Sequence, residues 1–192
     1  MPETTYRNRR AHRIETEDLR VTVLVEGGHI AEIADKRSGV NPLWTPPWPS
    51  IEPSSFDPVK YPDYGADSES KLLAGIMGHN LCLDLFGGPS EAEAAAGLTV
   101  HGEGSVARYD VASGQHEITA RASMPMAQLR FERRLRLRPG SRAIAITETV
   151  ENVPRRPVRP RLYERSADPS DAESRHAGVC RPTRLDDHHT SA

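Results

Sequence analysis

The second half of the chain contains four segments in which apolar and polar residues alternate. They span residues 105–111, 116–124, 127–137 and 142–150. Turn-forming residues separate them at Ser113-Gly114, Met124-Pro125 and Pro139-Gly140. In the third segment the odd positions from Leu129 to Leu137 are mostly apolar and the even positions are charged. One face of such a strand meets a core and the other meets water, so the pattern predicts an all-β, antiparallel β-sandwich.

A β-hairpin is predicted near the start of the chain. Leu19–Val25 alternates and is rich in β-branched residues, and a second run begins at His29 and ends at Asp35. Gly27-Gly28 lies between the two runs, which is a hairpin signal. Residues 1–13 have scattered charges and no apolar run, so we expect a flexible N-terminus that is neither a secretory signal nor an anchor.

Residues 45–65 are predicted to form a loop, because prolines remove ladder donors and fix φ. The segment also contains four aromatic residues, which disordered linkers usually lack. Two interpretations stay open: the loop covers the mouth of a pocket, or its aromatic rings only fill the edge of the core. The prolines and aromatics are Pro46, Pro47, Pro49, Pro53, Pro58, Pro62, Trp48, Phe56, Tyr61 and Tyr64.

Two short helices are expected between the hairpin and the later strands. Residues 68–77 are consistent with one helical turn, and residues 90–96 with a second. Ser90 followed by Glu93 fits a capping box at the start of the second helix.

The composition changes at Pro154. Residues 154–192 contain eight arginines, six acids, five prolines and a single aromatic residue, Tyr163. Such a segment buries too little apolar surface to offset its conformational entropy, so we expect an Arg/Pro-rich disordered tail. Asp186-Asp187 and His188-His189 lie in this tail, where a closed metal shell is not expected. The sequence therefore predicts no metal site.

Overall composition limits the classes of protein that this chain can represent. The 192 residues, 36% of them hydrophobic, suffice for one domain with a core, which we place at residues 14–153. A net charge of -2 predicts neither a nucleic-acid nor a membrane partner.

No apolar run is long enough to span a bilayer, so we expect a cytoplasmic protein. Cys82 and Cys180 are the two cysteines, too few for a disulfide framework.

Polar chemistry is concentrated between Gly78 and Gly104. This stretch contains His79 and His101, several carboxylates and many glycines, and predicted strands flank it. Functional sites are commonly built from such loops on a rigid scaffold. We therefore take it as the candidate site.

Four motifs resemble the N-terminal half of an aldose 1-epimerase, a galactose mutarotase-like protein. They are Gly27–Ile33, Asn41–Trp44, Gly75–Gly78 and Gly97–Glu103, and the resemblance covers residues 19–153. It implies an antiparallel sandwich with a sugar in a cleft on one sheet, an isomerase of carbohydrate metabolism, and no cofactor. In that family a carboxylate removes the proton of the anomeric hydroxyl while a histidine protonates the ring oxygen.

The resemblance implies roles for particular residues. His101 takes the position of the family's first catalytic histidine, which orients the sugar. His79 and Asn80 lie near an Asn-Arg pair that contacts sugar hydroxyls in many members, although the arginine is missing here. Glu103 and Trp44 complete the expected substrate-binding set, Trp44 by stacking on a sugar face. The structural alternatives are a turn histidine, a capping glutamate and a packed tryptophan.

The family's second histidine and general base would follow Val153, where this chain has the arginine-rich segment instead. We therefore expect an incomplete sandwich from a truncated or frame-shifted gene, with no mutarotation above background. The alternatives are a non-catalytic or vestigial carbohydrate-binding module, and an interaction protein that pairs through an exposed sheet edge. Uncovered apolar faces of an incomplete sandwich would also favour self-association.

Overall fold

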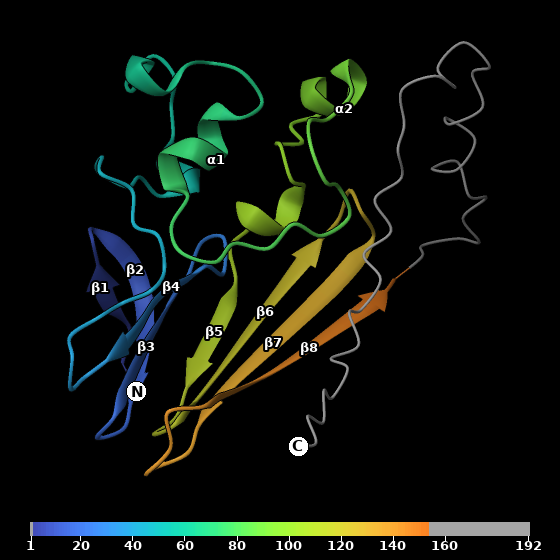
Figure 1. The fold of residues 1–192 in the computed structure, drawn as a ribbon. Helices are drawn as coiled ribbons and strands as arrows, with labels where there is room; N and C mark the ends of the chain where they lie inside the picture. The colour runs from blue at the N-terminus through green and yellow to red at the C-terminus, as the bar shows by residue number, and fades with distance from the viewer. Residues whose placement is uncertain (1, 154–192) are drawn as a thin grey trace, which may run out of the picture. The chain divides into compact units, whose positions relative to one another are not determined.

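Two antiparallel sheets of four strands each make up the fold of residues 2–153, the part of the chain that the computed structural model describes (Figure 1). The first sheet has the order β1-β2-β3-β4 and the second the order β5-β6-β7-β8. This arrangement confirms the expected all-β, antiparallel fold. The strands are β1 (Thr4–Tyr6), β2 (Arg9–Glu15), β3 (Leu19–Leu24), β4 (Ile30–Asp35), β5 (Asp110–Ser113), β6 (Glu117–Met124), β7 (Leu129–Leu137) and β8 (Ile144–Asn152).

The first two strands correct one expectation. Residues 4–15 lie mostly in the segment expected to be a flexible N-terminus, yet they form β1 and β2. In β2 both faces of the strand are buried and a charged residue takes a buried position: Arg9 is fully buried on the face of Ala11, and Ile14 is fully buried on the opposite face. A hydrophobic pattern cannot indicate such a strand when its inward side chains are paired charges.

The predicted hairpin of β3 and β4 is confirmed. Gly27 and Gly28 form its turn with φ values of 79° and 58°, a left-handed conformation that glycine adopts without steric cost. A Cβ atom at Gly28 would also lie 2.6 Å from the ring of Tyr109. The turn is therefore packed directly against the residue that precedes β5.

The second sheet follows the predicted alternation in β6 and β7. The strand β8 also forms where it was predicted, but its residues do not alternate in burial, because all of them after Ile144 are exposed. The predicted strand at 105–111 is wrong at its beginning, because Glu103–Ser105 forms the 3-10 helix η3 and β5 begins at Asp110. The intervening backbone bonds to the turn between β3 and β4 instead of to β6. The amide of Gly27 donates to Ala107 O and that of Tyr109 donates to Val25 O, at 2.7 and 2.8 Å.

The main core lies between the facing sides of the two sheets. Ile14, Val21 and Val23 of the first sheet pack in one cluster with Ile118 and Leu135 of the second, and all five are fully buried. Each such side chain contributes about 1.5–3 kcal/mol by leaving water. A smaller cluster on the other face of the first sheet contains Ala11, Leu24, Ala31 and Met77.

The outer edge of the second sheet is less well covered. Ile146 and Val150 lie on β8 opposite Leu135 and Phe131 of β7, so they continue the core-facing side of the sheet. Nevertheless 48% of Ile146 and 49% of Val150 is exposed. Apolar side chains therefore remain in solvent along this edge strand.

The segment between the sheets contains only short helices. The 3-10 helices η1 (Pro53–Ser55) and η2 (Pro62–Tyr64) interrupt the proline-rich loop. The helix α1 (Ser70–Gly75) lies within the predicted range. The helix α2 (Glu91–Ala95) begins with the predicted capping box of Ser90 and Glu93. In residues 2–153 no helix is long and apolar enough to cross a membrane, and the tail predicted at 154–192 lies outside the described residues.

Candidate functional site

The loops between Gly78 and Gly104 are attached to the first sheet at their beginning. The backbones of His79 and Ile30 exchange two hydrogen bonds of 3.0 Å, and the amide of Gly78 donates to Trp44 O at 2.8 Å. Gly78 has a φ of 60°, and a Cβ there would clash with Ile30 O. Only glycine fits this crossing.

His101 is held by backbone contacts with the segment around Gly87. Its amide donates to Gly87 O at 3.0 Å, and the amide of Gly87 donates to Nδ1 of the His101 ring at 3.3 Å. Since Nδ1 accepts a hydrogen bond, the neutral ring carries its proton on Nε2. The imidazole therefore has its tautomer set by the loop and keeps an N–H donor.

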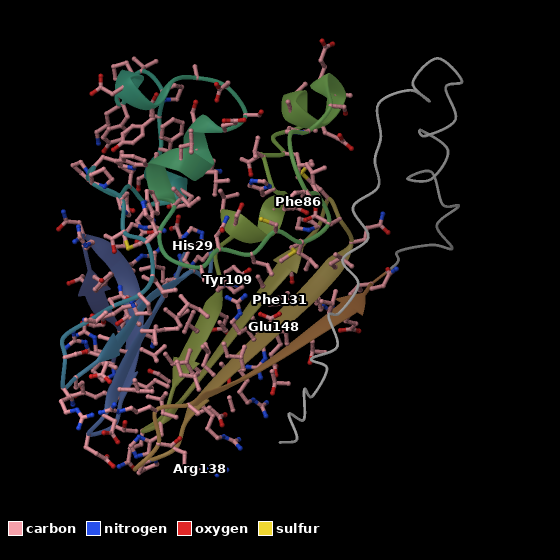
Figure 2. The ribbon with its side chains drawn as sticks, in the orientation of Figure 1. His29, Phe86, Tyr109, Phe131, Arg138 and Glu148 are labelled. Carbon is pink, nitrogen blue, oxygen red and sulfur yellow. The ribbon has the colours of Figure 1, made fainter. Side chains whose placement is uncertain are left out.

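Phe86 lies beside this imidazole. The two ring centroids are 5.5 Å apart with a tilt of 44°, and 88% of Phe86 is exposed. Figure 2 shows Phe86 in the loop region at one end of the second sheet. An exposed phenyl ring does not pack in a core, so its face is available to an apolar surface of a ligand.

Two carboxylates flank Gly102 in the same loops. A Cβ at Gly102 would clash with Oδ1 of Asp84 and lie 2.6 Å from Leu83 O. Oε2 of Glu103 accepts hydrogen bonds from the amides of Met126 and Ala127 at 2.8 and 2.9 Å. Glu103 thus binds the β6–β7 turn, whereas the Asp84 carboxylate interacts with the backbone of the adjacent Leu85 and lies against Gly102.

Burial, and secondly the negative charge of Glu103, raise the pKa of Asp84 to about 6. Asp84 and His101 both have positive φ values, 71° and 64°. Such conformations are uncommon for residues other than glycine and are often found at functional sites. The cluster combines an N–H donor, an aromatic face and a carboxyl that changes charge near pH 6.

The structure brings together only part of the predicted set. His101 and Glu103 lie in this cluster, but Glu103 is engaged with the β6–β7 turn. His79 contacts Ile30 through its backbone, and its side chain and that of Asn80 are partly or fully exposed. Within residues 2–153, no hydrogen bond, ion pair or ring contact joins His79 or Trp44 to His101. Trp44 instead packs edge-to-face on Trp48, with centroids 5.6 Å apart.

Phe86 was not predicted as a site residue, and Asp84 was not in the predicted set. An exposed aromatic ring and a loop carboxylate have no distinctive spacing in a sequence. The one sequence feature that could have indicated Phe86 is the pair of glycines that follows it, because Gly87 contacts His101 directly.

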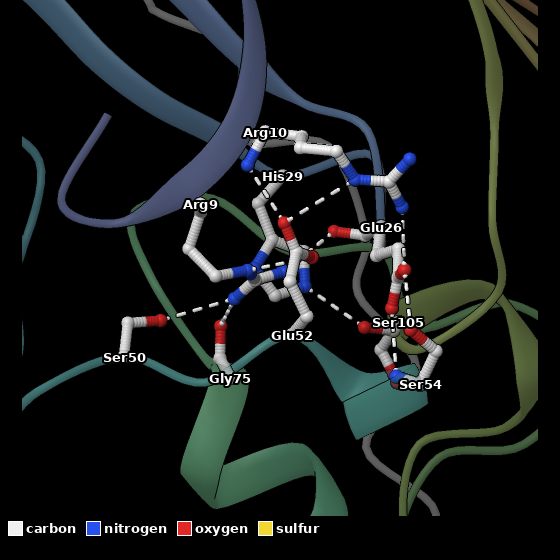
Figure 3. Close-up of polar contacts among 9 residues, drawn as sticks. All are labelled: Arg9, Arg10, Glu26, His29, Ser50, Glu52, Ser54, Gly75 and Ser105. Atoms are coloured by element: carbon white, nitrogen blue, oxygen red, sulfur yellow. Dashed lines mark hydrogen bonds and ion pairs between the residues drawn. The ribbon is translucent and has the colours of Figure 1, made fainter. Parts of the chain in front are cut away.

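A second polar cluster lies beneath the proline-rich loop and is shown in Figure 3. The guanidinium of Arg9, fully buried, donates to Glu52 Oε2, Ser50 Oγ, Gly75 O and Glu26 O at 2.7–3.0 Å. These bonds fasten the loop and α1 to the first sheet. Every partner belongs to the protein, so this cluster holds the fold together and presents no open site.

His29 extends this cluster toward the loops of the candidate site. Its Nε2 donates to Ser105 O at 2.9 Å and Nδ1 has no partner within the described residues. Complete burial, and secondly the charge of Arg9, lower the pKa of His29 to about 3. The ring is neutral at physiological pH and acts as a structural donor.

The outer face of the second sheet contains a hollow of about 580 Å³ lined mainly by charged residues. Arg121 pairs with Glu132 at 2.6 Å, and Arg130 with Glu151 at 3.7 Å. These cross-strand pairs satisfy one another in solvent, which is the usual behaviour of an exposed sheet face. In residues 2–153 no group of three or more histidine, cysteine or carboxylate side chains is placed to hold a metal ion.

No protein-family model matches the chain, and no curated protein matches it. Among solved structures, a galactose mutarotase-like protein from Lactobacillus casei ATCC 334 matches with 14% sequence identity and a TM-score of 0.43. The match covers 74% of this chain and 44% of that one, so this chain spans less than half the length of that protein. At this identity the likeness concerns the fold alone.

Proposed function

We propose that this chain is a carbohydrate-binding protein whose sugar site is formed by Phe86, His101 and Asp84. The observation that carries the proposal is the exposed phenyl ring of Phe86 beside an imidazole whose tautomer is set by Gly87. A sugar has an apolar C–H face and several hydroxyls. The phenyl ring suits the first, and the Nε2–H donor and the carboxylate acceptor suit the second.

The same contacts favour binding over catalysis. Interconversion of anomers needs an acid at the ring oxygen and a base at the anomeric hydroxyl, on opposite sides of the sugar. Glu103 already accepts two backbone hydrogen bonds, which reduces its use as a base. Asp84 is the remaining carboxyl of the cluster, and its raised pKa of about 6 makes it a stronger base than an ordinary aspartate. However, it lies against Gly102, the residue that follows His101, and no contact among the described residues places it across a bound sugar from the imidazole. We therefore propose binding without anomerisation above background.

Binding is tested by saturation-transfer NMR with glucose and galactose. We expect signal transfer to the sugar protons, with loss in both Phe86→Ala and His101→Ala. Val59→Ala is the matched control, because Val59 is an equally exposed apolar side chain at 88% in another loop. Absence of transfer in the unmodified protein, or equal transfer in all variants, would contradict the proposal.

Catalysis is tested separately by polarimetry on freshly dissolved α-glucose and α-galactose. We expect the rate of mutarotation to equal that of buffer. A clear acceleration that disappears in His101→Ala would replace the binding proposal with an aldose 1-epimerase activity. Loss of that acceleration in Asp84→Asn as well would identify the base.

A second candidate function is self-association through β8. This edge strand runs from Ile144 to Asn152 without proline, lysine or arginine, the residues that usually protect an edge. Its acids are neutralised within the chain, Glu148 by Arg133 at 2.7 Å and Glu151 by Arg130 at 3.7 Å. Two copies of the strand can therefore approach without strong repulsion.

The occupant that we propose for this edge is β8 of a second copy, paired antiparallel about a two-fold axis. The exposed side chains of Ile146 and Val150 would then be covered. Sedimentation velocity over a range of concentrations should show a monomer–dimer equilibrium that Ile146→Lys shifts to monomer. A monodisperse monomer at every concentration would rule out this candidate.

A further inference from the structure

A separate cavity of about 370 Å³ lies within the proline-rich loop region. Its lining comes from three segments: the loop before η1, the helix η2 and the helix α1. The lining residues are Trp48, Pro49, Asp63, Tyr64 and Leu73. None of them belongs to the candidate sugar site. The cavity is large enough for a small organic molecule.

The polar atoms of its two aromatic residues are already engaged. Trp48 Nε1 donates to Leu73 O at 3.3 Å, and the Tyr64 hydroxyl donates to Pro49 O at 2.7 Å. These bonds fix the rings in place and leave mainly their apolar surfaces for a ligand. A sugar, which needs several hydrogen bonds, would find few donors here.

Asp63 supplies the only charge of the lining. Within residues 2–153 its carboxylate takes part in no ion pair. The carboxylate acts directly on the neighbouring ring, since burial and secondly the negative charge of Asp63 raise the pKa of Tyr64. The cavity thus combines aromatic surfaces with a negative charge that has no ion-pair partner among residues 2–153.

The walls are also held in position before any ligand enters. Trp48 packs edge-to-face on Trp44 at a centroid distance of 5.6 Å, and Tyr64 on Phe56 at 6.5 Å. Prolines at positions 46, 47, 49, 53, 58 and 62 restrict the backbone around them. A restricted site loses less conformational entropy on binding.

We propose that this cavity binds a small organic cation, a methylated ammonium of about the size of choline. The electron-rich faces of Trp48 and Tyr64 attract a cation, and Asp63 provides the opposite charge. Methyl groups suit the apolar walls, where the Tyr64 hydroxyl oxygen is the one side-chain acceptor besides Asp63. This inference does not depend on the proposed sugar site, because the two sites share no residue.

The test compares choline with 3,3-dimethylbutan-1-ol, its uncharged isostere, at constant ionic strength. Binding is followed through tryptophan fluorescence, because the chain contains only two tryptophans, at positions 44 and 48. Isothermal titration calorimetry provides an independent affinity. We expect saturable binding of choline and about tenfold weaker binding of the uncharged isostere.

Variants assign the binding to this cavity. Asp63→Asn should weaken choline binding and reduce its advantage over the isostere, while the attraction of the cation to the two aromatic faces remains. Asp57→Asn is the matched control, an exposed aspartate of the same loop outside the cavity lining, and should bind choline normally. Tyr64→Phe keeps the ring and should also bind. Absence of saturable choline binding, equal affinity for the isostere, or an unchanged affinity in Asp63→Asn would each overturn the proposal.

Discussion

The imidazole of His29 donates a hydrogen bond of 2.9 Å from Nε2 to the backbone oxygen of Ser105. This bond connects the β3–β4 turn to η3, the short helix that begins at Glu103. The position of the candidate sugar site relative to the first sheet therefore depends on the His29 imidazole, which is neutral in the folded protein at physiological pH.

Stability should fall in acid because of His29. Its pKa is about 3 in the folded protein against an ordinary 6.5, so the unfolded chain binds a proton that the folded one excludes. The contribution is complete above pH 6.5 and decreases as pH falls toward 3. Urea unfolding at pH 7.5, 6 and 5 should show a smaller decrease for His29→Gln than for the unmodified protein. His116→Gln, a change at a solvent-accessible ring, should retain the full decrease.

Asp84 should show the opposite dependence. Its pKa is raised from 3.8 to about 6, so the folded state binds more protons, and stability falls as pH rises through this interval. Asp84→Asn should gain melting temperature relative to the unmodified protein between pH 4 and pH 7. Carbon-13 NMR of the side-chain carboxyl gives the pKa directly, and a midpoint near 4 would contradict the prediction.

Gly102→Ala should destabilise the fold by roughly 1–3 kcal/mol. Gly102 has a φ of 81°, and an added Cβ would meet Asp84 and the oxygen of Leu83. Gly114→Ala is the control, since a Cβ there has no neighbour closer than 3.9 Å. Chemical denaturation of both variants should separate them, and equal stabilities would show that the two loops adjust freely.

Two buried arginines should respond differently to replacement by methionine. Arg9→Met leaves the Glu52 carboxylate and three other acceptors without their donor, and we expect a loss of about 3–5 kcal/mol. Arg133→Met also removes Nη2, which has no partner within residues 2–153. Its loss should be clearly smaller, measured as the free energy of unfolding in urea. A larger loss for Arg133→Met than for Arg9→Met would contradict this order.

The strands of the second sheet could be predicted because their two faces meet different environments. In β7 the buried Phe131 and Leu135 alternate with the exposed Arg130 and Arg134, and this period-two pattern is local. In β2 both faces are buried, since Arg9 and Ala11 lie on one face and His12 and Ile14 on the other, so the period-two pattern is absent. One of these buried residues is Arg9. Its partners are 17–66 residues away in sequence, so no local pattern indicates them.

The sequence indicated His101 as a residue of the candidate site, but it did not indicate that Phe86 and Asp84 lie near it. A histidine in a glycine-rich loop is conspicuous in sequence, whereas the contact of Phe86 with its ring depends on how two loops cross. Gly102 permits that crossing through its close approach to Asp84. Trp44 was predicted to stack on a sugar because of its residue type; the structure shows it edge-to-face with Trp48, and its role in binding stays a prediction. Tertiary packing therefore decides which of the conspicuous side chains lie together.

The order of the strands also has a consequence for how the chain folds. In both sheets every strand pairs with its neighbour in sequence, so each sheet can form through successive hairpins with short loop closures. The hydrogen bonds of Arg9 to Ser50, Glu52 and Gly75 close much longer loops. We expect the proline-rich segment to dock last, which makes it the first part to detach when the protein is stressed.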